Sequence, residues 1–385
     1  MRKAALVLLL ALATALHAAP FTPANDNEVV EKLPATTDPA VRNVLSLRRQ
    51  LEARPDDGAL RLEIARRYFD LAMAQGDPRY VGYAQAALVP VAQSSAGDAR
   101  YWLLQGMVQQ YGHDFDGALQ SLAKSASLDP RSAEPLAWRA AIFMVQARYA
   151  EAKAECDKLV PLADPLYTQG CRAYVQATTG GLRAAYEALD AAMRARPDVA
   201  PELELWLRTR LAEMAVRLQQ PDAAEAHFRA ALRTGVTDQF LLGAYADFLI
   251  ARGRAGHAIT LLNNWERSDI LLLRMATAGR MAGDPRARDW AKQLRERFDD
   301  AARRGDRLHE QEAARFTLEI EGRPDAALAL AKRNYEKQKE PRDAEILLRA
   351  AVAARQSQAA QAAIEWLRAS RYEDPALAKL AEALK

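Results

Sequence analysis

The histidines, the side chains that most often serve in acid–base and metal chemistry, are few and scattered in this sequence. There are five, and no two have a metal-ligand spacing such as H-x3-H. His113 falls in a polar turn and His309 begins a helical stretch, while His227 and His257 lie beside positions of a helical pattern. The sequence therefore predicts surface or capping roles for these side chains and no metal site.

Other groups that could do chemistry also lack a suitable setting. The carboxylate pairs Asp56-Asp57 and Asp299-Asp300 fit helix ends better than a general acid–base site. Gly180-Gly181 is not part of a phosphate loop and separates two helical stretches. No serine has the strand–turn–helix context of a nucleophile. We predict a protein that is not an enzyme and has no cofactor, although acid–base partners distant in sequence are the alternative.

The amino-terminal segment predicts export. Arg2 and Lys3 form a basic start, and the uncharged run 4–16 is too short to span a membrane. A cleavage site between Ala18 and Ala19 completes the pattern of a signal peptide. A retained anchor or a buried amino-terminal helix is the alternative. No later stretch is long and apolar enough to span a membrane, so we expect a periplasmic or secreted protein without a membrane span in the mature chain.

The charge balance argues against a nucleic-acid partner. The net charge is +3, and removal of Arg2 and Lys3 leaves +1. A nucleic-acid-binding protein would carry a basic stripe, whereas acidic and basic residues are interspersed along this chain. Arginines such as Arg148, Arg172 and the pair Arg66-Arg67 are interpreted as solvated helix faces.

The elements that would position any site are helices, and the stretch from Asp98 to Pro130 shows their pattern best. Trp102 and Gly106 fall on a first helix, and Gly106 is small enough for a neighbouring helix to approach closely. Ala118 and Leu122 mark a second helix that ends before the proline. A polar turn separates the two. The stretch is thus a pair of short helices.

This unit resembles one tetratricopeptide repeat, whose 34-residue pattern is W-x2-L-G-x2-Y, then A-x3-F, then P. Four of its residues match in type and spacing, and Leu122 replaces the Phe. Gln105 and Gln109 depart from the expected Leu and Tyr. Ala152, 34 residues after Ala118, begins the same signal again. Further copies are marked by Ala185 and Leu189, by Ala224 and Phe228, by the set Ala246, Leu249, Ala258 and Leu262, by Ala314 and Gly322, and by Ala350 and Ala362.

The resemblance extends over roughly residues 39–384 and is weakest at 270–303. It implies an all-α fold, a right-handed α-α superhelix (TPR solenoid) of about eight helix pairs in an elongated array. A single pair of this size cannot bury its apolar face, so stacking supplies the core. The resemblance further implies a concave side, lined by first helices, that holds a peptide or partner protein.

The expected organisation has four segments. The signal peptide (1–18) precedes an extended leader (19–37) rich in Pro, Asn and Thr. Asp38 can cap and Pro39 can begin an amino-terminal capping helix at 38–54. The repeat array occupies 55–385.

Candidate partner-binding residues follow from the helix register and from unassigned tyrosines. Arg66 and Asp70 lie on a side of their helix that the core positions do not use. Such opposite charges four residues apart can also pair with each other. The Lys/Asn clamp of chaperone-binding relatives is not implied, because Met107 and Ala141 stand where its Asn would be. The full candidate set is Arg66, Asp70, Tyr80, Tyr83, Arg100, Tyr111, Glu213 and Arg217.

The only two cysteines, Cys156 and Cys171, are predicted to form a disulfide. Export places them where disulfides persist. Cys156 falls on the second helix of one repeat and Cys171 on the first helix of the next, and the turn at Asp164-Pro165 brings the chain back. Two buried free thiols are the alternative.

We expect an exported scaffold or adaptor that binds a protein or peptide partner in the cell envelope. The alternatives are an envelope enzyme built on an α-helical superhelix and a glycan-binding subunit of an export system. A deep pocket with convergent carboxylates would favour the enzyme, and a long groove with charged and tyrosine residues would favour the adaptor.

Overall fold

The computed structural model describes residue 25, residues 38–306 and residues 308–385. The predicted signal peptide and nearly all of the predicted leader lie outside this part. The described residues form helices and no strand, so the predicted all-α class is confirmed. The α-helices are α1 (Pro39–Ala53), α2 (Gly58–Gln75), α3 (Arg79–Leu88), α4 (Ala99–Tyr111), α5 (Phe115–Leu128), α6 (Glu134–Val145), α7 (Tyr149–Lys158), α8 (Pro165–Thr178), α9 (Leu182–Arg194), α10 (Pro201–Arg217), α11 (Pro221–Arg233), α12 (Gln239–Ala251), α13 (Ala255–Leu261), α14 (Asp269–Ala282), α15 (Ala287–Arg303), α16 (Glu310–Glu319), α17 (Pro324–Lys337), α18 (Pro341–Ala354), α19 (Gln361–Ser370) and α20 (Pro375–Glu382), with two 3-10 turns, η1 (Val89–Val91) and η2 (Ser357–Ala360).

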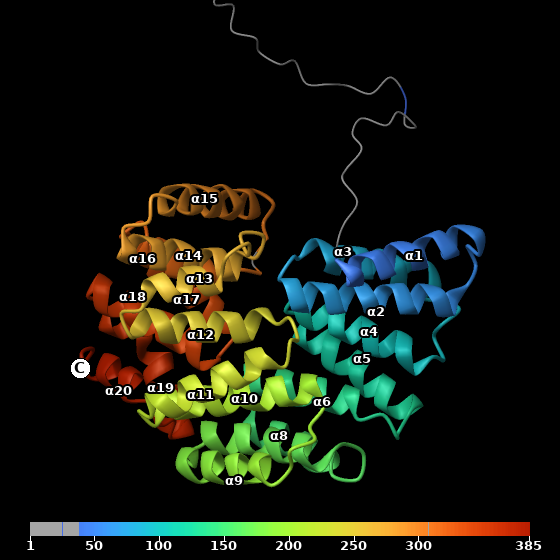
Figure 1. Cartoon of the computed structure of the whole chain (residues 1–385), viewed down its shortest axis with the longest axis horizontal. Coiled ribbons are helices and arrows are strands. Elements are labelled where there is room, and N and C mark those ends of the chain that lie inside the picture. Colours follow the sequence, from blue (N-terminus) through green and yellow to red (C-terminus); the bar gives the residue numbers. More distant parts are fainter. Residues whose placement is uncertain (1–24, 26–37, 307) are drawn as a thin grey trace, which may run out of the picture.

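The helices are arranged in antiparallel pairs that stack in chain order (Figure 1). Among the described residues there are nine such pairs, from α2–α3 to α18–α19, flanked by α1 and α20. The stretch 270–303, where the sequence pattern is weakest, forms the complete pair α14–α15. The predicted number of about eight pairs is therefore close to the observed number.

Side-chain caps and prolines fix where the helices begin and end. Asp38 accepts hydrogen bonds from the backbone N–H groups of Ala40 and Val41, as its place before Pro39 predicts. Pro90 ends α3, because the chain passes there into the 3-10 turn η1. The same kind of cap, with a side-chain oxygen accepting from the first turn, is made by Asp57, Asp98, Asp114, Asp164, Asp238, Ser268 and Asp374.

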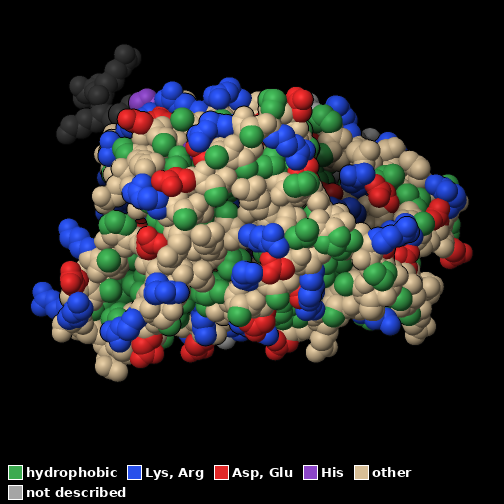
Figure 2. Space-filling model, turned by 90° about the horizontal axis from the view of Figure 1, so that it is seen from below, with side chains coloured by type: hydrophobic (Ala, Val, Ile, Leu, Met, Phe, Trp, Pro, Cys, Tyr) green, Lys and Arg blue, Asp and Glu red, His purple; other side chains and the backbone are tan. Residues whose placement is uncertain are grey.

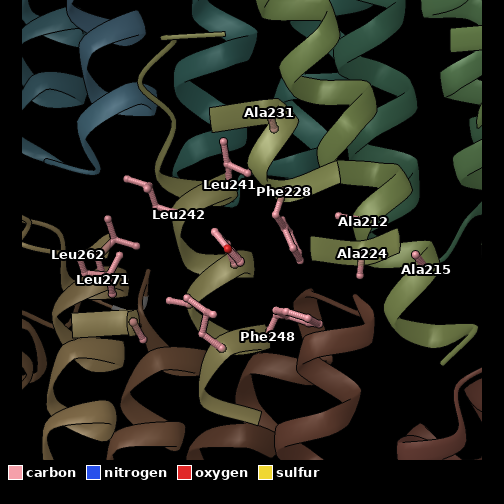
Figure 3. Packing of buried hydrophobic residues seen from close by; sticks show 14 of the residues in the cluster. Ala212, Ala215, Ala224, Phe228, Ala231, Leu241, Leu242, Phe248, Leu262 and Leu271 are labelled. Carbon is pink, nitrogen blue, oxygen red and sulfur yellow. The ribbon is translucent and has the colours of Figure 1, made fainter. Parts of the chain in front are cut away.

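Small residues allow the helices of a pair to lie close together. A Cβ atom added at Gly106 would come within 2.7 Å of the Leu122 side chain, so this glycine is required for close approach. Ala118 and Ala224 are both fully buried, as the repeat register predicts. Figure 3 shows part of the largest core cluster, where Phe228 of α11 lies among alanines and leucines of α10, α11 and α12.

Enlarging these alanines is expected to destabilise the fold. Ala118→Leu and Ala224→Leu should each lower the free energy of unfolding by about 1–3 kcal/mol, because the added carbons have no space. Ala123→Leu is the matched control, since Ala123 lies on the same helix as Ala118 but is exposed. Urea denaturation midpoints measure the effect. Equal midpoints for Ala118→Leu and Ala123→Leu would contradict the register.

The array is wound back on itself, which corrects the expectation of an elongated shape. The backbone N–H of Lys339 donates to the carbonyl of Val145 at 2.7 Å, and the Trp366 indole N–H donates to the Tyr149 hydroxyl at 2.7 Å. Helix α12 also contacts α2, and Figure 1 shows the carboxy-terminal helices beside the middle of the array. A small rotation at each repeat accumulates until distant repeats meet.

Candidate functional site

Charged side chains from four first helices of successive pairs form one connected network, named here the charged ladder. Arg274 of α14 donates to Asp247 of α12 at 2.6 Å, and Arg315 of α16 donates to the other oxygen of Asp247 at 3.2 Å. Arg315 also contacts Glu319 at 3.3 Å, and Arg349 of α18 reaches Glu319 at 2.7 Å. The ladder therefore ties together four repeats on the side formed by their first helices.

Most side chains of the charged ladder are largely buried, and Asp247 is the most exposed of them. The side chain of Arg274 is 5% exposed, whereas that of Asp247 is 37% exposed. Burial alone would raise the pKa of Asp247, but Arg274 and Arg315 outweigh it and lower that pKa to about 2. Burial lowers the pKa of the Arg274 guanidinium, and Asp247 opposes this effect. The arginine stays protonated at neutral pH because its ordinary pKa is so high.

A second group of polar side chains, named here the interior arginine pair, centres on Arg210 of α10 and Arg342 of α18. Arg210 donates to Glu213 at 2.7 Å and lies over the Tyr174 ring, 4.7 Å from its centre. Arg342 lies within electrostatic reach of Glu213, Tyr174 and Glu340, so α8, α10 and α18 meet here. These five side chains are partly accessible. The loop before α18 and two helices of the middle repeats thus bring polar groups near one another.

Arg217 fastens the carboxy-terminal end of the chain beside the interior arginine pair. Its guanidinium lies 3.8 Å from the centre of the Tyr372 ring. It also donates to the carbonyls of Ala177 at 2.6 Å and Glu373 at 3.0 Å. This predicted partner-binding residue therefore has a structural role in the wound array. Its predicted neighbour Glu213 pairs with Arg210 instead.

Arg66 and Asp70 lie together on the first helix of the first repeat, as their spacing predicts. Arg66 donates to Asp70 at 2.9 Å and to Glu134 of α6 at 2.8 Å. All three side chains are between 36% and 42% exposed. The contact joins first helices of alternate repeats, so Arg66 and Asp70 belong to the same side of the array as the charged ladder.

The predicted tyrosines do not form a single patch. Tyr80 and Tyr83 both contact the Tyr68 ring, with centroids 6.0 and 5.2 Å away, and Tyr83 is 51% exposed. Tyr111 is not in ring contact with any of them, and burial together with Asp77 raises its pKa to about 12. Tyr111 therefore belongs to the interior, whereas Tyr83 faces outward.

Arg100 binds its own helix cap. The guanidinium of this exposed residue donates to Asp98 at 2.6 Å, and Asp98 also caps α4. The pair is local, and the structure does not bring Arg100 to the other predicted residues through any hydrogen bond or ion pair among the described residues.

The sequence prediction missed the charged ladder and the interior arginine pair. Asp247 and Arg315 each directly follow the small residue of a first helix, which is the position that Arg66 has in the first repeat. Extending that register to the later repeats would have found them. Arg342 lies in the first turn of α18, outside the repeat positions, so no periodic signal marks it.

The seam, where the turn between α4 and α5 meets the loop before α18, contains a histidine that burial keeps neutral. His113 has its Nδ1 atom 3.4 Å from Nε2 of Gln338, a residue in the loop before α18. Burial, helped by nearby His309 and opposed by Glu312, lowers the pKa of His113 to about 4. A cavity of about 330 Å³ beside the seam is lined by residues that include His113, Arg333 and Gln338. The seam therefore favours the neutral imidazole, which accepts a hydrogen bond from the amide.

Stability is expected to depend on pH through His113. As the pH falls from about 6.5 to about 4, the unfolded chain binds a proton that the folded chain excludes, so stability is lost. The loss should be about 2 kcal/mol between pH 7 and pH 4.5. His113→Asn should remove this part of the pH dependence, because an asparagine side chain does not bind a proton in this pH range. Asn is the suitable replacement because it tolerates the left-handed backbone at this position, where φ is 59°. Urea unfolding at the two pH values measures the loss of unfolding free energy. An equal loss in the wild type and in His113→Asn would contradict the prediction.

The predicted disulfide between Cys156 and Cys171 is present. It joins α7 to α8, with the two Cα atoms 5.7 Å apart. Arg172 and Asp157 form an ion pair at 2.6 Å across the same helices. The bond therefore links the second helix of one pair to the first helix of the next, as the sequence predicts.

The helix pairs of this chain are tetratricopeptide-like. Trp102, Gly106, Ala118 and Leu122 occupy the helices that the repeat pattern assigns to them. No family model matches the sequence, and no curated protein matches it. Similar solved structures include the type IV pilus biogenesis factor PilW, with 20% identity over 56% of this chain and 97% of that chain at a TM-score of 0.40. Yeast Tom70 is 13% identical over 90% of this chain and 84% of that chain, at a TM-score of 0.43.

A further similar structure is the TPR domain of P58(IPK), with 13% identity over 85% of this chain and 97% of that chain at a TM-score of 0.27. At these identities and TM-scores, the likenesses assign neither a family nor a function to the chain. Within the described residues, no helix is both long and apolar enough to cross a membrane, and no group of three or more His, Cys, Asp or Glu side chains could hold a metal ion.

Proposed function

We propose that this chain is an exported scaffold or adaptor in the cell envelope and binds a protein or peptide partner inside its wound array. The observation that carries the proposal is the accessible charged surface of the first helices. Glu345 of α18 is 45% exposed and Asp247 of α12 is 37% exposed, although both lie beside charged side chains of the neighbouring first helices or of their own helix. Polar groups that keep contact with solvent inside an array are available to a partner.

Two features support the remaining parts of the proposal. The Cys156–Cys171 disulfide is typical of an oxidising compartment, in agreement with the predicted signal peptide at 1–18. The face of the molecule that Figure 2 shows offers no strong charged field for a partner. In the view of Figure 2, acidic and basic side chains are intermixed over the surface.

Site-specific cross-linking tests the location of the partner. A photo-cross-linking amino acid at Glu345 should capture a partner in cells, whereas the same amino acid at Lys124, which is exposed on α5, should not. Equal capture at both positions, or none at Glu345, would contradict the proposal. Fractionation of the same cells, with mass spectrometry of the mature amino terminus, tests export: a chain that begins at Ala19 is the expected product.

A further inference from the structure

The loop between α19 and α20 lies against α9 and α10, two helices of the middle repeats. The Glu373 carboxylate accepts a hydrogen bond at 2.9 Å from the backbone N–H of Leu182, the first residue of α9. The Glu373 carbonyl accepts a hydrogen bond from Nε of Arg217 at 3.0 Å. The centre of the Tyr372 ring lies 3.8 Å from the central carbon of the same guanidinium. Two consecutive residues of the loop therefore make three specific contacts with distant helices.

The amino terminus of α9 is shaped to receive a carboxylate from this loop. Its N-cap residue is Gly181, which has no side chain to cap the helix, and Glu373 supplies the carboxylate instead. The partial positive charge of a helix amino terminus favours such a group. At Gly180, where φ is 86°, an added Cβ atom would lie only 3.0 Å from the Cβ atom of Arg371. The two glycines thus allow the loop to approach closely.

Arg217 is also held by a contact that does not involve the loop. One of its terminal nitrogens donates to the carbonyl of Ala177 in α8 at 2.6 Å. Its Nε–H and the face of its guanidinium are then directed at the loop. A guanidinium over an aromatic ring is a favourable cation–π contact, and its hydrogen bond to a main-chain carbonyl is independent of side-chain type. The surface therefore recognises an aromatic residue that is followed by an acidic residue.

The contacts of the loop are accessible to solvent. Arg371 and Glu373 are exposed, and Tyr372 is half-buried. The following helix, α20, packs against α18 and not through these contacts. Exposed polar contacts contribute little net free energy, because water competes for the same groups. A segment of the same chemistry from another protein can therefore exchange with the loop.

We propose that residues 371–374 act as an internal ligand, and that a partner segment with an aromatic residue followed by an acidic residue binds the same surface in their place. Arg217 would contact the aromatic ring and the main-chain carbonyl of that segment, and the amino terminus of α9 would bind its carboxylate. This inference rests on the proposed function, since it names the chemical class of the partner segment.

A blocked, fluorescently labelled peptide with the sequence of residues 370–374 tests the inference on the intact mature protein. Fluorescence anisotropy measures binding over a range that reaches millimolar peptide. The wild type should bind weakly, because a tethered internal ligand competes at an effective concentration on the order of millimolar. Tyr372→Ala/Glu373→Ala should bind the peptide at least about tenfold more tightly, because this competition is removed. Addition of Arg217→Gln to that variant should abolish the gain.

The controls separate recognition by the surface from a change in the fold. Glu365→Ala/Arg368→Ala replaces two exposed residues of the preceding helix α19 and should bind the peptide as weakly as the wild type does. A counterpart peptide with Ser and Gln in place of Tyr and Glu should bind no variant measurably. Circular dichroism should show equal helix content for all variants. If Tyr372→Ala/Glu373→Ala loses helix content, Glu373→Gln alone is used, since Glu373 is exposed and its change should give part of the gain.

Three results would overturn the inference. The first is a released surface that binds the peptide no better than the wild type, which would make the loop a brace for the closed array. The second is equal affinity for the counterpart peptide. The third is full binding after the addition of Arg217→Gln.

The cross-linking experiment separates this inference from the proposed function. If a partner is captured at Glu345 while the peptide fails to bind the released surface, the adaptor function stands and the internal ligand is wrong. If the peptide binds as expected while no partner is captured at Glu345, the surface stands and the adaptor function is wrong.

Discussion

The Asp247→Asn variant should unfold at a clearly lower urea concentration than the wild type. Asp247 is the only described carboxylate that contacts both Arg274 and Arg315, and the Arg274 side chain is 5% exposed. Removing one partner of a buried ion pair leaves the other charge uncompensated, which costs about 3–5 kcal/mol. Because the Asp247 side chain is 37% exposed, solvent screening reduces the expected loss to about 2–4 kcal/mol.

Asp157→Asn is the matched control for this prediction. The Asp157 side chain is 38% exposed and also has two cationic partners, Lys153 at 2.7 Å and Arg172 at 2.6 Å. Those partners are 63% and 46% exposed, so they remain hydrated when the carboxylate is removed. We expect a loss below about 1 kcal/mol for Asp157→Asn. Equal losses for the two variants would mean that burial of Arg274 does not set the energy of the charged ladder.

The ion pairs of Asp247 also predict how acid affects the stability of the wild type and of the Asp247→Asn variant. The pKa of Asp247 is lowered from 3.8 to about 2, so its contribution is present above about pH 4 and is lost as the pH falls toward 2. Asp247→Asn should lack this part of the acid dependence. Urea unfolding of both proteins between pH 5 and pH 3 measures the difference.

The helix pairs could be predicted from the sequence because their signals are local. Gly106 and Ala118 mark positions where two helices touch, and aspartates mark where helices begin. Each of these preferences acts within one repeat or between neighbouring repeats. The same signals recur about every 34 residues along the chain, which makes them recognisable. The same logic placed Cys156 and Cys171 on facing helices, because they lie on consecutive helices joined by one short turn.

The closure of the array could not be predicted in this way. The Lys339–Val145 contact joins residues of different repeats, and it depends on the sum of many small rotations between successive pairs. No single residue type encodes that sum. The expected concave side is therefore part of a wound array, in which Arg217 joins α10 to the carboxy-terminal segment.

The interior arginine pair escaped prediction for a related reason. Arg210 and Arg342 come from helices far apart in the sequence, and only closure brings them together. The charged ladder differs, because Asp247 and Arg315 occupy a repeat position that the register identifies. The described structure thus contains two kinds of site residue. The positions of some follow from their place in the repeat, and the positions of others follow from the closure of the array.

Loss of the Cys156–Cys171 disulfide is the other change for which we expect a large effect. The bond closes a loop with a sequence separation of 15, and the chain-entropy model gives about 3 kcal/mol for a loop of this size. Dithiothreitol should therefore lower the urea midpoint of the wild type. The double variant Cys156→Ala/Cys171→Ala should have a low midpoint that dithiothreitol does not change.

The double variant separates the bond from the packing of the sulfur atoms. Cys156 is fully buried, so replacing it by alanine also removes a packed atom. Comparison of reduced wild type with the double variant isolates that packing contribution, because neither protein then has the bond. Thiol titration of denatured, unreduced exported protein should give no free thiol, and two per chain would refute the bond in the cell.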